Sequence, residues 1–193
     1  SKGRAERILL EAATPALVLR VPMVIGPGDF VSKALAREAQ ATFAPLLRGG
    51  AGREQPIDAN DVISAVLAGL GLSQRDDAGH DDADGGRSAL DGVALDLAGP
   101  VSLSRRELLE RTSSLYDNRP RVVPVPLALE MGLAWLFEKL LRDPPLSRAM
   151  VGVLNHDDEI DVSDACKCLG IKLTALDETL RRCVGPEAPK WTP

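Results

Sequence analysis

Residues 16–30, ALVLRVPMVIGPGDF, decide the fold that the sequence predicts. The apolar run at residues 17–19 is typical of a strand that is covered on both faces of a parallel sheet. The Gly-Pro-Gly turn at residues 26–28 ends that strand, and Asp29 can cap a helix that follows it. Because ligands of open α/β sheets bind at the carboxyl ends of the strands, we expect a ligand near residues 21–28.

The composition describes one globular domain with a core built of aliphatic residues. The chain has 193 residues, 45% of them apolar and 26% charged, and its formal net charge is -5. This negative charge argues against a nucleic-acid partner, and no apolar run is long enough for stable membrane insertion. Three cysteines, an odd number, argue against a disulfide framework. They favour a reducing compartment, the cytoplasm or an organelle matrix or stroma.

Apolar periodicity and turn residues give the expected order of elements. Ser104 and Glu107 form a capping-box pattern, and Ser163 and Thr174 are expected to cap two later helices. Residues 43–58 are expected to be irregular. The expected elements are helices over residues 2–13, 30–42, 60–70, 104–116, 126–141, 147–154, 163–170 and 174–185, and strands over residues 16–20, 92–97 and 121–125.

Five segments, in this order, resemble the second half of an extended or atypical short-chain dehydrogenase/reductase of the NAD-dependent epimerase/dehydratase family. The first resembles the end of the family's Tyr-x-x-x-Lys motif, and the second its Arg-x-x-x-Val-Tyr-Gly-Pro-Gly-Asp segment. Residues 121–126, RVVPVP, resemble an atypical subgroup that is similar to the nucleotide-binding accessory subunit of respiratory complex I. The five segments are residues 1–6, 19–29, 53–62, 97–104 and 160–171.

The resemblance implies an α/β fold, the C-terminal part of a Rossmann-like parallel sheet with a small, mostly helical substrate-binding region. Residues 1–72 would belong to the Rossmann-like part, with an insertion into the substrate region. Residues 73–91 would form an acidic flexible loop, residues 92–185 a strand and the helical substrate-binding region, and residues 186–193 a tail.

The resemblance also assigns candidate cofactor-binding residues. Lys2 would hold the nicotinamide ribose and lower the pKa of the family's catalytic Tyr, although it could equally be a solvated helix lysine. Val21, Pro22, Met23 and Val24 would line the nicotinamide pocket, and strand-end packing is compatible with that role. The cofactor would be NAD or NADP.

Two arginines have alternative roles. Arg53 would face the diphosphate of a nucleotide substrate, since a guanidinium matches phosphate geometry, or it could be a surface arginine. Arg20 either pairs with an acid at the edge of the sheet, which is the role we expect, or helps to shape the site. We expect no metal site, because positions 166 and 168 of a helix point in different directions and no further ligands complete a set.

The leading hypothesis is an NAD(P)-dependent oxidoreductase or epimerase that moves hydride between nicotinamide and a small-molecule substrate, a sugar nucleotide being one candidate. The alternative is a non-catalytic nucleotide-binding or assembly subunit, and a homodimer or an assembly partner fits either. The family's glycine-rich phosphate loop is absent, and its Tyr would lie upstream of Ser1. We therefore expect the natural chain to begin upstream, and these residues alone to be inactive and to bind NAD(P) weakly.

Overall fold

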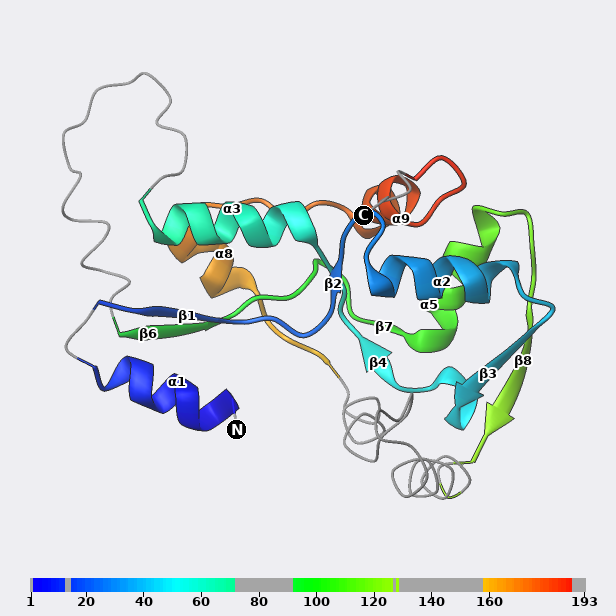
Figure 1. Cartoon of the computed structure of the whole chain (residues 1–193), viewed down its shortest axis with the longest axis horizontal. Coiled ribbons are helices and arrows are strands. Elements are labelled where there is room, and N and C mark those ends of the chain that lie inside the picture. The colour runs from blue at the N-terminus through cyan, green and yellow to red at the C-terminus, as the bar shows by residue number, and fades with distance from the viewer. Residues whose placement is uncertain (1, 13–14, 72–91, 127, 129–157, 189–193) are drawn as a thin grey trace.

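The computed structural model describes residues 2–12, 15–71, 92–126, 128 and 158–188. Two halves lie side by side along the long axis (Figure 1). The sheet half contains β1 and β6 with α1, α3 and α8, and the helical half contains α2, α5 and α9 with β3 and β8. The elements are α1 (Lys2–Leu10), β1 (Leu17–Arg20), β2 (Val24–Ile25), α2 (Phe30–Gln40), β3 (Phe43–Leu47), η1 (Arg48–Gly50), β4 (Arg53–Glu54), β5 (Ile57–Asp58), α3 (Ala59–Gly69), β6 (Val93–Asp96), β7 (Leu103–Ser104), α5 (Arg105–Ser114), β8 (Arg121–Val125), α8 (Ser163–Leu169) and α9 (Leu176–Cys183).

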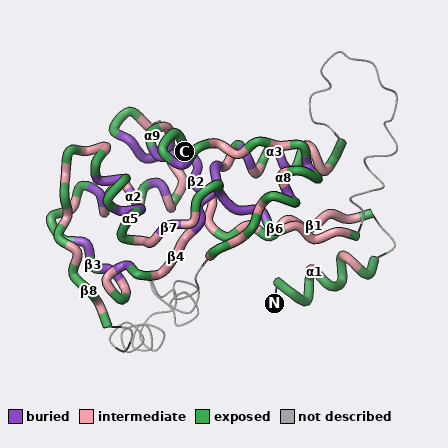
Figure 2. Tube along the Cα trace, turned by 180° about the vertical axis from the view of Figure 1, so that it is seen from behind, coloured by how far each residue is buried: buried purple, intermediate pink, exposed green. Residues whose placement is uncertain are grey.

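The predicted parallel sheet is confirmed by the pairing of β1 with β6. Leu17 lies opposite Val93 and Arg20 opposite Asp96, so segments far apart in the sequence run side by side. Helices α3 and α8 lie on one face of this pair and α1 on the other (Figure 1). Helices therefore lie on both faces of β1 as predicted, but its three apolar residues are only half-buried (Figure 2). The physical reason is that α1 buries none of its own residues against that face.

The helical half is organised by the parallel pair of β3 and β8, packed beside α2 and α5. Its core gathers buried side chains of α2, α5 and α9, and a separate core lies under β1, β6, α3 and α8. The edge strand predicted at residues 121–125 is confirmed as β8, whose partner in the described part of the chain is β3. Pro124 therefore interrupts no second ladder.

The expectation that residues 43–58 are irregular is wrong. They contain β3, β4 and β5, and β2 lies in the turn after β1. Strand β2 pairs in parallel with β5, and β4 pairs antiparallel with β7. Three of these strands have two residues each, too few for an alternating pattern to be read.

Two predicted helix starts and one predicted helix end are confirmed. Asp29 accepts a hydrogen bond from the backbone N–H of Ser32 and caps α2. Ser104 and Glu107 form the expected capping box at α5. Helix α8 ends at Gly170, whose φ of 62° places it in the left-handed region where glycine is favoured.

Two predicted caps are wrong. Ser163 is the first residue of α8, and its N–H donates to the side chain of Asp161. Thr174 lies before α9 and donates from both its N–H and its hydroxyl to Asp61, at 2.7 and 2.8 Å. Thr174 therefore bonds the distant carboxylate of Asp61, whereas the local pattern predicts that it caps the helix that follows it.

Some predicted elements lie outside the described residues. They are the acidic loop over 73–91, the helices over 126–141 and 147–154, and all but the first three residues of the tail. The division into domains stays a prediction. In the described part of the chain no helix is both long enough and apolar enough to cross a bilayer.

Candidate functional site

The turn after β1 is held in place by strand β2 and by the cap of α2. The Met23 carbonyl accepts a hydrogen bond from Ile57 N–H at 2.9 Å, which fixes the turn against β5. Asp29 accepts from the N–H of Gly26 at 2.8 Å, and Ser32 donates its hydroxyl to the Gly26 carbonyl at 2.5 Å. The segment at residues 21–28, where the sequence predicts a ligand, is therefore a turn at the carboxyl end of β1 that hydrogen bonds hold in place.

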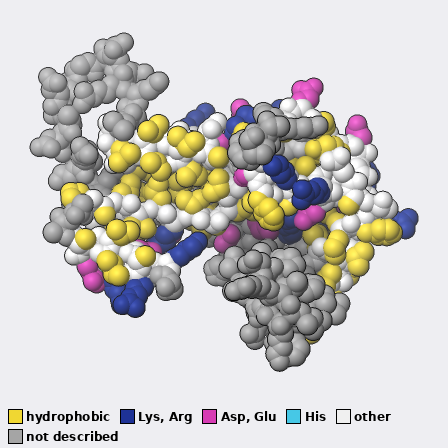
Figure 3. All heavy atoms as spheres, viewed as in Figure 1, with side chains coloured by type: hydrophobic (Ala, Val, Ile, Leu, Met, Phe, Trp, Pro, Cys, Tyr) yellow, Lys and Arg dark blue, Asp and Glu magenta, His cyan; other side chains and the backbone are white. Residues whose placement is uncertain are grey.

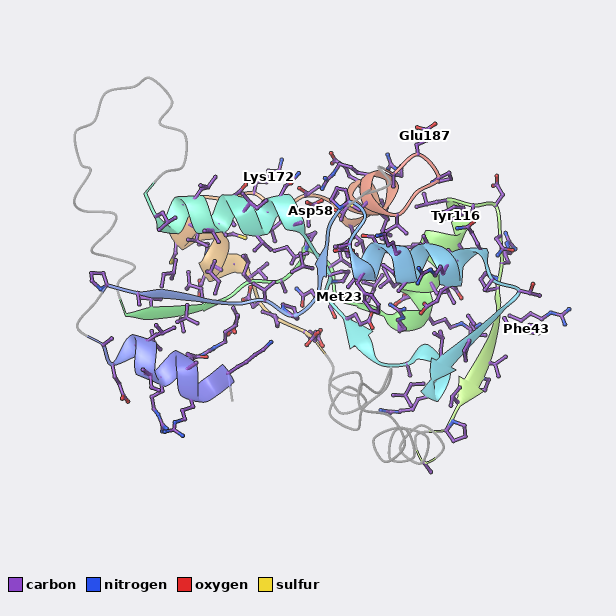
Figure 4. The ribbon with its side chains drawn as sticks, in the orientation of Figure 1. Met23, Phe43, Asp58, Tyr116, Lys172 and Glu187 are labelled. Carbon is purple, nitrogen blue, oxygen red and sulfur yellow. The ribbon has the colours of Figure 1, made fainter. Side chains whose placement is uncertain are left out.

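This turn forms one wall of a cavity of about 570 Å³. Three of the four predicted nicotinamide-pocket residues, Pro22, Met23 and Val24, line it. Met23 lies near the middle of the molecule, between the two halves (Figure 4). Val21 is not part of the described wall and packs against the core of the sheet half. The remaining described wall consists of Phe30, Val31, Ala34, Leu35, Glu38, Pro45, Leu46, Leu47, Gly52, Glu54, Arg105 and Asp158.

Charged side chains meet in one part of this wall. Arg105, at the start of α5, donates to Glu38 at 2.5 Å and to Glu54 at 3.3 Å. The three side chains are only 19 to 34% exposed, so this bridge is more protected than an ordinary surface pair. The bridge joins α2, β4 and α5 around the cavity.

Arg53 lies beside the cavity and outside its described wall. It donates from Nε to the Ser102 hydroxyl at 3.1 Å and from Nη2 to the Ser102 carbonyl at 3.0 Å. Its Nε is 4.0 Å from a carboxylate oxygen of Glu159. The backbone of Arg53 accepts from Asp158 N–H at 3.1 Å, and Asp158 does line the cavity. These contacts hold the segment at residues 158–159 to β4, and a contact of Arg53 with substrate stays a prediction.

Lys2 is exposed at the first residue of α1. The amino end of α1 lies toward the carboxyl end of β1 (Figure 1). Arg20, the last residue of β1, donates to Glu6 at 2.5 Å and to Asp96 at 3.3 Å, which confirms its expected pairing at the sheet edge. Lys2 precedes Glu6 by four residues, so both lie on one face of the helix. The Arg20 hydrogen bond lowers the pKa of Glu6.

Tyr116, the only tyrosine of the sequence, has a structural role. Its hydroxyl donates to the Val184 carbonyl at 2.6 Å and ties the end of α5 to α9. Burial raises its pKa. It lies in the helical half, apart from Met23, so it cannot stand in for the Tyr that the family motif places upstream (Figure 4).

Sequence reasoning missed the roles of Gln55 and Asp58, two buried polar residues that join segments far apart in the chain. Gln55 donates its side-chain amide to the carbonyls of Gly99 and Ile160 at 2.8 and 2.9 Å, and accepts from Ile160 N–H at 2.8 Å. Asp58 caps α3 through Asn60 N–H. The signal for Asp58 was its place directly before an apolar helix.

No group of three or more metal-ligating side chains occurs within residues 2–12, 15–71, 92–126 and 158–188. The three cysteines are free thiols. Burial raises the pKa of Cys166 and of Cys183, which makes both thiols poor ligands and poor nucleophiles near neutral pH.

Comparison with known proteins identifies the fold class. No family model matches the chain. Over 158 residues, 81% of this chain, it is 27% identical to NADH dehydrogenase (ubiquinone) 1 alpha subcomplex subunit 9, mitochondrial, from Arabidopsis thaliana. Those residues correspond to 36% of that protein, so the chain spans about a third of the relative's length.

Solved structures, several of them of epimerases, share the fold. RMD from Pseudomonas aeruginosa, complexed with NADPH, matches with a TM-score of 0.61 at 18% identity, over 95% of this chain and 53% of that one. A nucleoside-diphosphate-sugar epimerase from Staphylococcus aureus matches with a TM-score of 0.62 at 19% identity, over 93% and 57%. UDP-glucuronic acid 4-epimerase from Bacillus cereus, in complex with NAD, matches with a TM-score of 0.57 at 12% identity, over 93% and 46%.

These matches confirm the predicted resemblance to proteins of the epimerase/dehydratase type, and the likeness to the solved structures is one of fold. The mixed α/β fold with parallel strand pairs is shared with these solved structures. The chain corresponds to about half the length of each of these structures.

Proposed function

We propose that this chain forms the substrate-side part of an NAD(P)-dependent oxidoreductase or epimerase. The observation that carries the proposal is the cavity at the carboxyl end of β1, walled by Pro22, Met23 and Val24. Structural neighbours of this chain are complexes with NADPH and with NAD, which supports a nicotinamide cofactor without choosing between the two.

The described residues fit one end of such a cofactor. Pro22, Met23 and Val24, which follow β1, form an apolar wall against which a nicotinamide ring could lie. The described residues contain no matching loop for the phosphates, because Gly49 and Gly50 lie in the short 3-10 helix η1, Gly52 follows it, and none of the three begins an α-helix. The cofactor would supply the hydride acceptor or donor.

Lys2 would act on a tyrosine at the carboxyl end of β1. A cationic ammonium near a phenol favours the phenolate, so the tyrosine could exchange a proton with the substrate near neutral pH. The position of the amino end of α1 at that end of the strand supports this role (Figure 1).

The experiment uses the protein at its native length, established by intact mass and by reading the residues before Ser1. Binding of NADH and NADPH is measured by calorimetry, and turnover is followed by nicotinamide absorbance with a panel of carbonyl substrates. Lys2→Ala is expected to abolish turnover, whereas Arg4→Ala, on the same exposed helix, leaves it unchanged. Failure of the native-length protein to bind either dinucleotide would overturn the proposal.

A second candidate, a non-catalytic nucleotide-binding or assembly subunit, is favoured by the similarity to the complex I subunit from Arabidopsis thaliana. Under this proposal, the native-length protein binds a dinucleotide, turns over no substrate, and lacks a tyrosine four residues before Lys2. An assembly partner or a second copy of the chain, in a reducing compartment, is part of the proposal. Exposed apolar residues on α3 support a partner (Figure 3).

A further inference from the structure

The charges around the cavity point to the class of its ligand. The described wall contains three carboxylates, from Glu38, Glu54 and Asp158, and one guanidinium, from Arg105. Its other residues are apolar apart from Gly52. An anion that enters this space would therefore meet an excess of negative charge among the described residues of the wall.

The guanidinium of the wall is already engaged. Arg105 uses one terminal nitrogen for Glu38 and the other for Glu54, and both carboxylates belong to the same wall. Arg53 of β4, which lies beside the cavity, donates from Nε and Nη2 to Ser102. A diphosphate would have to break these contacts to obtain a bidentate partner.

The size of the cavity does not decide between ligands, because about 570 Å³ accommodates many small molecules. Its chemistry does. Side chains of α2, β3 and the turn after β1 present aliphatic surface, which favours an apolar body, while the carboxylates disfavour a negatively charged head.

We propose that the part of this cavity left for a substrate binds an uncharged, largely apolar molecule, of the class of medium-chain alcohols, aldehydes and ketones, and rejects nucleoside diphosphates as substrates. The inference rests on the proposed function, since such a molecule would be the partner in hydride transfer. It replaces the sugar nucleotide that the family resemblance suggests as a substrate.

The test measures displacement of Nile red, a neutral dye that fluoresces in apolar sites, from the protein at its native length. The competitors are 1-decanol and decanoate, which share a chain length and differ in charge, and UDP. We expect 1-decanol to displace the dye, decanoate to bind about tenfold more weakly or worse, and UDP not to compete at millimolar concentration. Displacement by UDP, or equal affinity for 1-decanol and decanoate, would overturn the proposal.

Two variants locate the binding to this cavity. Ala34→Trp fills the space from α2 and is expected to abolish 1-decanol binding, while Gln40→Trp, at the exposed end of the same helix, leaves it unchanged. Circular dichroism shows that each variant keeps its helix content. If both variants lose 1-decanol binding equally, or if both keep it, the ligand does not bind in this cavity and the inference is rejected.

A third variant tests the charge argument directly. Glu38→Gln combined with Glu54→Gln removes two carboxylates and releases Arg105, so decanoate should gain at least about tenfold over 1-decanol. An unchanged preference would overturn the role assigned to these carboxylates.

Dinucleotide binding, measured on the same samples, separates the two proposals. NADH or NADPH binding without 1-decanol binding rejects the ligand class and leaves the proposed function standing. Binding of 1-decanol without either dinucleotide rejects the proposed function and supports the ligand class of the cavity.

Discussion

Arg182 of α9 donates a hydrogen bond to the side chain of Asp58, which is fully buried at the start of α3. Asp58 also accepts from the Thr179 hydroxyl and from Asn60 N–H, each at 2.8 Å. The two residues are 124 positions apart, and Asp58 lies where α3 approaches α9 (Figure 4). This ion pair therefore connects the sheet half to the helical half.

Asp58→Asn should lower the free energy of unfolding by about 2 to 3 kcal/mol. The substitution removes the charge that Arg182 pairs with and leaves the guanidinium, which is one-third exposed, only partly compensated. Urea denaturation measures the change. Asp177→Asn is the control, because its pair with Arg111 is 60% and 44% exposed and should contribute less than about 1 kcal/mol. Equal losses in both variants would contradict the buried role of Asp58.

The same residue predicts a pH dependence of stability. Burial alone would raise the pKa of Asp58, but hydrogen bonds from Arg182, Asn60 and Thr179 bring it below its usual value. The stabilisation is therefore fully present above the unfolded-state pKa of about 4, and it is lost as pH falls through the lower folded-state pKa. Unfolding free energies measured between about pH 2 and pH 7 should fall less steeply toward acid in Asp58→Asn. A slope identical to that of the parent would refute this assignment.

Signals carried by neighbouring residues were enough to predict part of the structure. The apolar run of β1, the cap at Asp29 and the box of Ser104 with Glu107 are all confirmed. Each depends on residues within one turn or one strand, where propensity and hydrogen bonding act locally. For the same reason, three of the candidate site residues, Pro22, Met23 and Val24, could be placed at a cavity from their position after a strand.

What could not be predicted depends on contacts between distant residues. Strand β2 exists because it meets β5, and two residues carry no period of their own. Thr174 was assigned as a cap because the carboxylate it meets, Asp61, lies 113 positions away. The bridge from Arg105 to Glu38 spans 67 positions, so the charge of the cavity wall became visible only in the folded chain.

Gly99→Ala should destabilise the protein by about 3 kcal/mol or more. A Cβ at this buried position would lie 1.8 Å from the carbonyl oxygen of Pro56 and 3.3 Å from the backbone nitrogen of Ile57. Both are backbone atoms, which cannot move aside as the end of a side chain can. The shift would also disturb the Gln55 hydrogen bonds to the Gly99 backbone. Thermal and urea unfolding measure the loss. Gly3→Ala is the control, since its Cβ would meet nothing within 4 Å in helix α1 and should be neutral or stabilising by about 0.5 to 1 kcal/mol. A harmless Gly99→Ala would contradict the close approach.

Ile63→Lys should reduce self-association with little effect on folding. Ile63, Val66, Leu67 and Leu70 follow one face of α3 and are 40 to 56% exposed, and Figure 3 shows hydrophobic side chains gathered over this helix. An apolar face of this kind favours association, and a charge at Ile63 interrupts it at a cost within about 0.5 kcal/mol of stability. Sedimentation velocity across a concentration series should show a smaller average mass for the variant. Ala65→Lys is the contrasting variant, because Ala65 is fully buried on the other face of α3 and a lysine there should unfold the chain. Unchanged association in Ile63→Lys would show that contacts between copies use a different surface.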